Sequence, residues 1–253
     1  MDDVTLMKVP DGGFAYVPSR GRAFSTGVVA LEGHVLRRVH LQHPLSFEAG
    51  FQFAAGSIRA AGRPLNALCG CELRIARRLT RSEFSEFNQR YIAALRTAGF
   101  NTEPVNPAAR TNVVPFAGTP TDATLTAFTF ATPGCARPTG PDFLVSGKPE
   151  LTGDSDEVIA PSDQSVAGLE AKAAFVLEEL QLIVRQLGAQ WVNATAVQIY
   201  SQHSVGNLKV VSESGLPIAV FTHVPGDPPV FGPGGVPLEF EADVRSVTLE
   251  DAL

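Results

Sequence analysis

The strongest constraint on the fold of this chain is a succession of helical and extended patterns that occurs twice. In each half, apolar residues at helical spacing are followed by a strand, a second helix and further strands. The segments of the first half are helices at 45–62 and 83–99 and strands at 65–75, 106–116 and 123–131. Those of the second half are strands at 143–151, 191–200, 217–224 and 236–244 and helices at 164–188 and 204–215. This order predicts a tandem duplication.

A short echo supports the duplication. The tripeptides Leu65-Asn66-Ala67 and Val192-Asn193-Ala194 each begin a few residues after the glycine that ends a helix. Between the halves, Pro and Gly cluster in TPGCARPTGPD and no periodic pattern continues. We therefore expect one domain at 1–135 and a second at 140–253.

The chain is long enough for two such domains, with 253 residues of which 44% are hydrophobic. The runs AFSTGVVAL and VLRRVHL, at 23–31 and 35–41, predict an amino-terminal hairpin around Glu32-Gly33.

The composition excludes several classes of partner. A net charge of -6 argues against nucleic acid, because phosphate binding needs clustered Lys and Arg. The start, MDDVTLMKVPDGG, carries acids where a secretory signal carries a basic region, and no apolar run approaches the length of a membrane span. We expect a cytoplasmic protein with no membrane partner.

Potential metal ligands are not gathered at suitable spacing. Cys69 and Cys71 lie two apart in an extended run, which predicts both side chains on one face, and Cys135 falls in a loop. His40 and His43 share a hairpin, but no cluster of acids lies with them. We expect structural thiols, no metal and no cofactor.

A row of acids marks the last strand. In GVPLEFEADV the apolar residues alternate strictly with Glu239, Glu241 and Asp243, so the three acids share one face. On a solvated strand they would be ordinary surface residues. In a cleft that excludes water, they would raise the pKa of one another through repulsion of like charges.

Four short motifs occur in a fixed order along the chain. They are Phe84, Asn88 and Tyr91 in EFSEFNQRY, Pro107, Arg110 and Thr111 in NPAARTNVV, Ser146 and Gly147 in FLVSGK, and Glu239, Glu241 and Ala242 in LEFEA. In this order they resemble the RidA/YjgF reactive-intermediate deaminases. The resemblance covers most of the chain.

The resemblance implies an α+β fold of two tandem RidA/YjgF-like (chorismate-mutase-like) domains. Each would be a β-sheet packed by two helices, and such domains form three-fold barrels with active sites between neighbouring domains. Since two domains cannot close a three-fold barrel, we expect three chains to form a homotrimer.

The resemblance also implies roles for individual residues. Arg110 would grip the carboxylate of a small anionic substrate, and Glu239 would position or activate water. Ser146 and Gly147 would line the cleft with backbone N–H groups, and Glu241 would contact the substrate. His223, expected one strand from Glu239, is a further catalytic candidate.

The two halves depart from the family pattern in complementary ways. Thr126 stands where the first half would carry the glutamate, and the strand at 217–224 lacks the arginine of the second half. Either one composite cleft takes Arg110 from the first half and Glu239 from the second, or both sites are lost and a binding scaffold is left.

The activity that the resemblance implies is hydrolytic deamination of a small enamine or imine carboxylate. By this resemblance the chain is similar to 2-aminomuconate deaminase and to general imine deaminases. The first of these would place the chain in the degradation of aromatic compounds. A chorismatase-like hydrolase or lyase is the alternative enzyme, and a non-catalytic carboxylate-binding protein is the alternative without chemistry.

Overall fold

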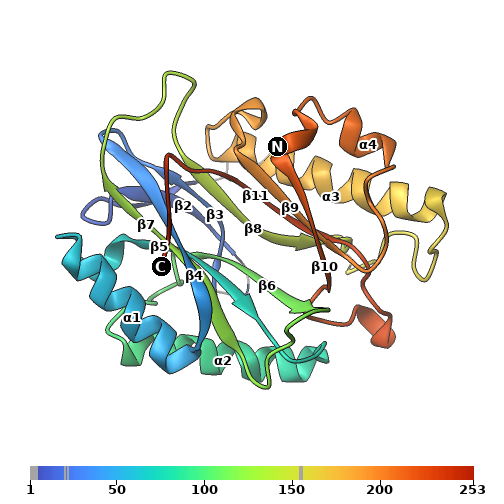
Figure 1. Ribbon diagram of the computed structural model, residues 1–253, viewed down its shortest axis with the longest axis horizontal. Coiled ribbons are helices and arrows are strands. Elements are labelled where there is room, and N and C mark those ends of the chain that lie inside the picture. The colour runs from blue at the N-terminus through green and yellow to red at the C-terminus, as the bar shows by residue number, and fades with distance from the viewer. Residues whose placement is uncertain (1–4, 20, 22, 154–155) are drawn as a thin grey trace.

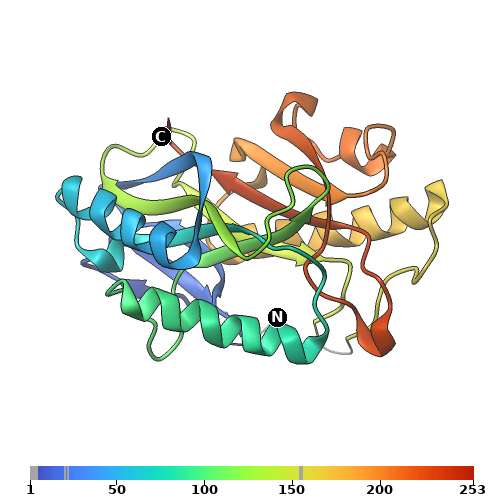
Figure 2. The same ribbon diagram turned by 60° about the horizontal axis from the view of Figure 1, so that its bottom comes forward.

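The fold is α+β, with one large sheet and two groups of helices, one packed on the strands of each half (Figures 1 and 2). A computed structural model describes residues 5–19, 21, 23–153 and 156–253. The strands are β1 (Met7–Val9), β2 (Phe14–Pro18), β3 (Ser25–Ala30), β4 (His34–Ser46), β5 (Leu68–Arg74), β6 (Ala109–Pro115), β7 (Thr124–Pro133), β8 (Phe143–Pro149), β9 (Ala196–Ser201), β10 (Phe221–Asp227), β11 (Glu241–Ser246) and β12 (Leu249–Ala252). The α-helices are α1 (Phe47–Ala60), α2 (Arg81–Thr97), α3 (Val166–Gln186) and α4 (Lys209–Ser212).

The three long helices begin and end where the sequence predicts. Ser46, Thr80 and Ser165 are their N-caps, and each side chain accepts a hydrogen bond from a backbone N–H in the first turn. Thr80 and Glu83 complete a capping box. Each helix is followed within two residues by a glycine of positive φ, a conformation that other residues adopt at a cost.

The same order of elements occurs in both halves. A long helix leads through a short 3₁₀ turn into a strand twice, first through Leu65–Ala67 and then through Trp191–Asn193. These turns hold the echoed tripeptide of the first half and most of that of the second. Figure 1 shows α1 and α2 on one side of the molecule and α3 and α4 on the other, with the strands between them.

The predicted amino-terminal hairpin is wrong. β3 pairs antiparallel with β2 along one edge and with β8 along the other, so neither edge is left for β4. β4 instead pairs antiparallel with β7 and parallel with β12. Gly33, at φ 77°, lies in the turn that separates β3 from β4.

Strand pairing therefore crosses between the halves. β1 to β3 extend the sheet of the second half through β8, and β12, at the end of the second half, extends the sheet of the first through β4. β6 also pairs with β10 over two residues and with β3 at Ser25↔Ala109. The domain bounds 1–135 and 140–253 and the homotrimer stay predictions.

Three clusters of buried apolar residues follow this arrangement. One packs α1 and α2 on β4, β5 and β7, and another packs α3 on β8, β9 and β11. The third lies where the halves meet and takes residues from β2 to β8, among them Phe14, Leu36 and Leu144. The interface between the halves is thus a core of its own, and its burial stabilises both sheets.

The predicted helix at 204–215 is α-helical only over α4, and β9 and β10 begin at Ala196 and Phe221 because a 3₁₀ turn precedes each of them. Two further strands also differ from the sequence prediction. β11 begins at Glu241 and not at 236, because the Glu150 carboxylate accepts hydrogen bonds from the backbone N–H groups of Glu239 and Phe240. Cys69 and Cys71 pack in different clusters, because the register of β5 against β7 shifts between Leu68 and Gly70 and turns the strand. Both thiols are buried and free.

A buried ion pair joins β4 and β5, two strands of the first half. The Arg38 guanidinium on β4 donates to both carboxylate oxygens of Glu72 on β5, at 2.6 and 2.8 Å, and both side chains are largely buried. Burial alone would raise the pKa of Glu72, but Arg38 lowers it to about 2.

We expect Glu72→Gln to lower the free energy of unfolding by about 3–5 kcal/mol, because the buried Arg38 loses its charged partner. Since the folded pKa of Glu72 lies below its unfolded value, the stabilisation is complete above about pH 4.5 and is lost as pH falls toward about 2. Urea unfolding between pH 3 and pH 7 measures both effects.

Asp122→Asn is the matched control, because the Arg90–Asp122 ion pair is exposed and its loss should cost less than about 1 kcal/mol. Equal losses in the two variants would contradict a special role for the Glu72 pair.

Candidate functional site

A cavity of about 210 Å³ opens where the two halves meet. The first half contributes an arginine, an amide and two aromatic rings to its wall, and the second half contributes an acid, a glycine and apolar residues. The lining residues are Phe24, Phe84, Arg110, Asn112, Gly147, Pro149, Leu151, Pro229, Val230 and Glu241. The structure thus brings Arg110, Gly147 and Glu241 together at one cavity, whereas the composite cleft predicted from the sequence paired Arg110 with Glu239.

Arg110, on β6, places a buried charge at this cavity. Its residue is 4% exposed, and the one hydrogen bond from its guanidinium to another described residue runs from Nη1 to the Asn88 Oδ1 atom, at 2.8 Å. Burial lowers the pKa of Arg110 to about 10, so the group is still charged at neutral pH. Among the described residues it forms no ion pair with a carboxylate.

Aromatic rings surround the Arg110 guanidinium. Its Cζ atom lies 4.2 Å from the ring centre of Phe24, 4.8 Å from that of Tyr91 and 5.4 Å from those of Phe84 and Phe87. Ring faces attract a cation but leave its N–H donors free. Arg110 is therefore held in place with unused donors that match a carboxylate.

The helix motif of the sequence builds this setting. Phe84, Asn88 and Tyr91 lie three or four residues apart on α2, so one face of the helix presents all three to Arg110. Tyr91 also accepts a hydrogen bond from Asn106 Nδ2, which lies in the loop before β6. The motif thus positions the arginine.

Ser146 and Gly147, on β8, support the site from the second half. The Ser146 Oγ atom accepts a hydrogen bond from the Arg110 backbone N–H at 2.9 Å and donates to the Ser25 carbonyl at 2.6 Å. A Cβ atom on Gly147 would lie only 2.1 Å from the Glu241 Oε1 atom. Gly147 therefore leaves the space that the Glu241 carboxyl fills.

Glu241, the first residue of β11, is buried at the cavity wall. Burial raises its pKa well above the usual value, and repulsion by Asp243 and Glu150 raises it further, while Arg110 opposes the shift. This shift favours the neutral form of the carboxyl, in which it can donate a proton.

Glu239 does not line this cavity. Its carboxylate pairs with the Lys172 Nζ atom on α3 at 2.7 Å and accepts from Gln164 Nε2 at 2.6 Å. Burial would raise the pKa of Glu239, but these two partners lower it on balance. His223 lies on the exposed face of β10, with its Nε2 atom 3.0 Å from the Ser201 carbonyl oxygen.

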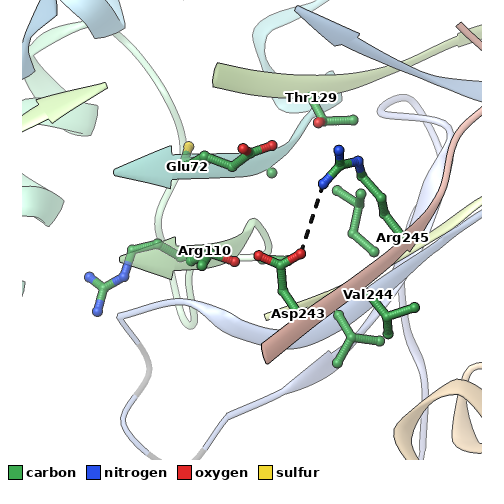
Figure 3. Close-up of a pocket in the computed structure, with 12 residues that line it drawn as sticks. Glu72, Arg110, Thr129, Asp243, Val244 and Arg245 are labelled. Carbon is green, nitrogen blue, oxygen red and sulfur yellow. Dashed lines mark ion pairs between the residues drawn. The ribbon is translucent and has the colours of Figure 1, made fainter. Parts of the chain in front are cut away.

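The third acid of the row belongs to a separate, smaller crevice. Figure 3 shows Asp243 facing Arg245 and Glu72 there, whereas the Arg110 guanidinium points away from them. The crevice has a volume of about 30 Å³, enough for a water molecule but not for a substrate. Asp243 accepts a hydrogen bond from Tyr200 at 2.7 Å and closes a structural network.

Sequence reasoning missed several residues of the cavity wall. Asn112 lies two residues after Arg110 on β6, and neither its Oδ1 nor its Nδ2 atom has a partner among the described residues. The spacing of two was a signal available from the sequence, because alternate residues of a strand share a face. Phe24 comes from the segment before β3, far from Arg110 in sequence, and no local pattern points to it.

The described residues contain neither a candidate metal site nor a candidate membrane-spanning helix. No group of three or more His, Cys, Asp or Glu side chains there could hold a metal ion. No helix within 5–19, 21, 23–153 and 156–253 is long and apolar enough to cross a membrane.

We expect Gly147→Ala to displace the Glu241 carboxyl from the cavity wall, because the new methyl group would overlap its Oε1 atom. A crystal structure of the variant should show a changed Glu241 side-chain conformation, and thermal unfolding should occur at a lower temperature. Gly56→Ala, on the exposed side of α1 with open space around it, is the control. An unmoved Glu241 carboxyl in Gly147→Ala would contradict the expectation.

Comparison with known proteins connects this chain to one family. The family model described as 2-aminomuconate deaminase CnbZ matches residues 6–251. The chain is 32% identical over 248 residues to the 2-amino-5-chloromuconate deaminase of Comamonas testosteroni, and the match covers 96% of each chain. The relationship to the 2-aminomuconate deaminases, which the sequence predicts, is confirmed.

Solved structures show more distant similarity. A chorismatase crystal structure shares 14% identity at a TM-score of 0.46, covering 87% of this chain and 77% of that one. The YjgF gene product of E. coli shares 16% identity at a TM-score of 0.30, covering 43% of this chain and 81% of that one. The match over 6–251 and the 32% identity decide the relationship: the chain belongs to the CnbZ family of 2-aminomuconate deaminases.

Proposed function

We propose that this protein is a hydrolytic deaminase of a small 2-amino-2-enoate dicarboxylate of the 2-aminomuconate type. One observation carries the proposal. A charged guanidinium that pairs with no carboxylate among the described residues and a carboxyl with a raised pKa line the same cavity, Arg110 from one half and Glu241 from the other. The first suits an anionic substrate, and the second suits acid catalysis.

Substrate binding rests on Arg110. Its planar fork of donors forms two parallel hydrogen bonds to the carboxylate on C2 of the substrate. The apolar side chains of Leu151 and Val230 line the same cavity and exclude water from the carbon chain. Low water content strengthens the ion pair with Arg110.

Glu241 moves the protons of the reaction. The neutral carboxyl donates its proton to C3 of the enamine, and the nitrogen lone pair forms the C=N bond of an iminium ion. A water oxygen then bonds to C2, the π electrons of the C=N bond return to nitrogen, and the Glu241 carboxylate accepts a proton from the water.

Release of ammonia completes the cycle. The Glu241 carboxyl protonates the amino nitrogen, the C–N bond breaks, and the electrons of the hydroxyl O–H bond form the C=O bond. The hydroxyl proton returns to Glu241. The products are ammonia and a 2-oxo acid, Glu241 is neutral again, and no step needs a metal or cofactor.

This scheme assigns to Glu241 the role that the family resemblance gives to Glu239. Glu239 is held by Lys172 and Gln164, with a lowered pKa, so it is a poor proton donor and fixes the segment that leads into β11. We propose the scheme for a cytoplasmic homotrimer that acts in the breakdown of aromatic compounds.

We expect Glu241→Gln to lower kcat for ammonia release from 2-aminomuconate by about 10²- to 10⁴-fold, because the amide cannot exchange protons. KM should change little. Glu239→Gln is the matched variant on the same segment. It should lower the temperature of unfolding, because Lys172 loses its charged partner, and it should leave kcat nearly unchanged. A large loss of kcat in Glu239→Gln with normal turnover by Glu241→Gln would reverse the two roles.

The pH dependence of the wild-type enzyme is the internal control for this assignment. Because the pKa of Glu241 is raised and its acid form is active, kcat/KM should fall as pH rises through that pKa. The residual activity of Glu241→Gln should lack this fall.

We expect Arg110→Lys to raise KM for 2-aminomuconate by about 10-fold or more with a smaller change in kcat, because an ammonium group cannot form the two parallel bonds. Steady-state kinetics measures the two constants separately. Arg63→Lys, an arginine outside the cavity that binds backbone carbonyls, is the control. Unchanged KM in Arg110→Lys would mean that the carboxylate binds elsewhere.

A further inference from the structure

Among the described residues that line the cavity, Asn112 is the polar one to which the scheme above gives no role. It is 3% exposed and follows Arg110 by two residues on β6. Both its Oδ1 acceptor and its Nδ2 donor are buried without a partner among the described residues. Buried amides nearly always have partners, so a group with both ends free calls for an explanation.

The amide group of Asn112 limits the kinds of hydrogen-bond partner that can satisfy it. A partner for Asn112 has to supply a donor to Oδ1 and an acceptor to Nδ2 at neighbouring positions. The apolar side chains of the cavity wall offer neither. Glu241, held neutral, offers one proton, which the proposed reaction uses. A ligand that carries such a donor and such an acceptor side by side would satisfy both atoms.

The 2-amino-2-enoate unit has this pair of groups. Its C2 atom carries an amino group, which donates, and the carboxylate carbon next to it carries oxygens, which accept. Resting on the proposed function, we propose that Asn112 is a specificity-determining residue: Oδ1 accepts from the substrate amino group and Nδ2 donates to the carboxylate that Arg110 grips.

This assignment has a consequence for selectivity. The 2-oxo product has an oxygen where the substrate has its amino group, so it presents no donor to the Asn112 Oδ1 atom. A buried acceptor facing an oxygen is unpaired and repelled. Asn112 thus favours substrate over product and over dicarboxylates that lack the amino group, and it helps the product to leave.

The test compares two ligands that differ only in the amino group, 2-aminomuconate and cis,cis-muconate. We expect Asn112→Leu, a change of similar size, to raise KM for 2-aminomuconate by about 10- to 100-fold. The inhibition constant of cis,cis-muconate should rise by a clearly smaller factor, because this ligand loses only the bond from Nδ2 and makes no use of the Oδ1 acceptor. A KM within about twofold of wild type, or equal weakening of both ligands, would overturn the proposal.

Asn66→Leu is the matched control. The Asn66 Oδ1 atom is also buried without a partner, but this residue lies outside the cavity, so the variant should keep the wild-type preference. Thermal unfolding of both variants checks the fold, and Asn112→Thr replaces the leucine variant if the latter does not fold.

A second experiment measures how Asn112 affects ligand binding in the absence of turnover. Both ligands are titrated by calorimetry into Glu241→Gln and into Glu241→Gln with Asn112→Leu. The first protein should prefer 2-aminomuconate by about 10-fold or more, and the second should show no preference. If wild-type protein releases no ammonia, the proposed function is wrong, while this ratio still decides the role of Asn112; equal ratios in the two proteins would refute it.

Discussion

The burial of one positive charge organises this molecule. The Arg110 guanidinium lies in the interior, and among the described residues it contacts ring faces and donates one hydrogen bond, to an amide oxygen. Taking a charge out of water without a counter-charge is expensive, so the fold has to recover that cost elsewhere. It does so through apolar packing in the cores of the two halves and in the cluster between them, which includes Ala109 of β6.

The position of the cavity follows from the way the halves join. β6 contacts β3 near its start and β10 near its end, and between these points a side chain, Ser146, takes the place of a neighbouring strand. The halves therefore part along the stretch of β6 that carries Arg110 and Asn112. Gly147 and Glu241 reach the same stretch from β8 and β11, and a site built on three strands is held rigidly.

Local features were predictable from the sequence, and non-local pairing was not. Periodicity and caps gave the three long helices, because the signals of a helix lie within a few residues of one another. The hairpin prediction failed because β3 takes β8 as its second neighbour, more than a hundred residues away in sequence. The start of β11 depends on Glu150, equally invisible to a local pattern.

The candidate site divides in the same way. The resemblance led to Arg110, Ser146, Gly147 and Glu241, which lie together in the structure. Strand alternation puts Glu239 and Glu241 on one face but does not tell which of them meets the cavity. That choice depends on Lys172 of α3, whose ammonium group captures Glu239.

The exchange of strands between the halves also bears on how the chain folds as it leaves the ribosome. β4 finds its parallel neighbour only in β12, about 200 residues later, and β3 waits for β8. A nascent first half thus carries bare strand edges until β8 and β12 have been made, and such edges invite pairing with other chains. The order in which the strands are made therefore differs from the order in which they lie in the sheet, and the first half cannot reach its native pairing by itself.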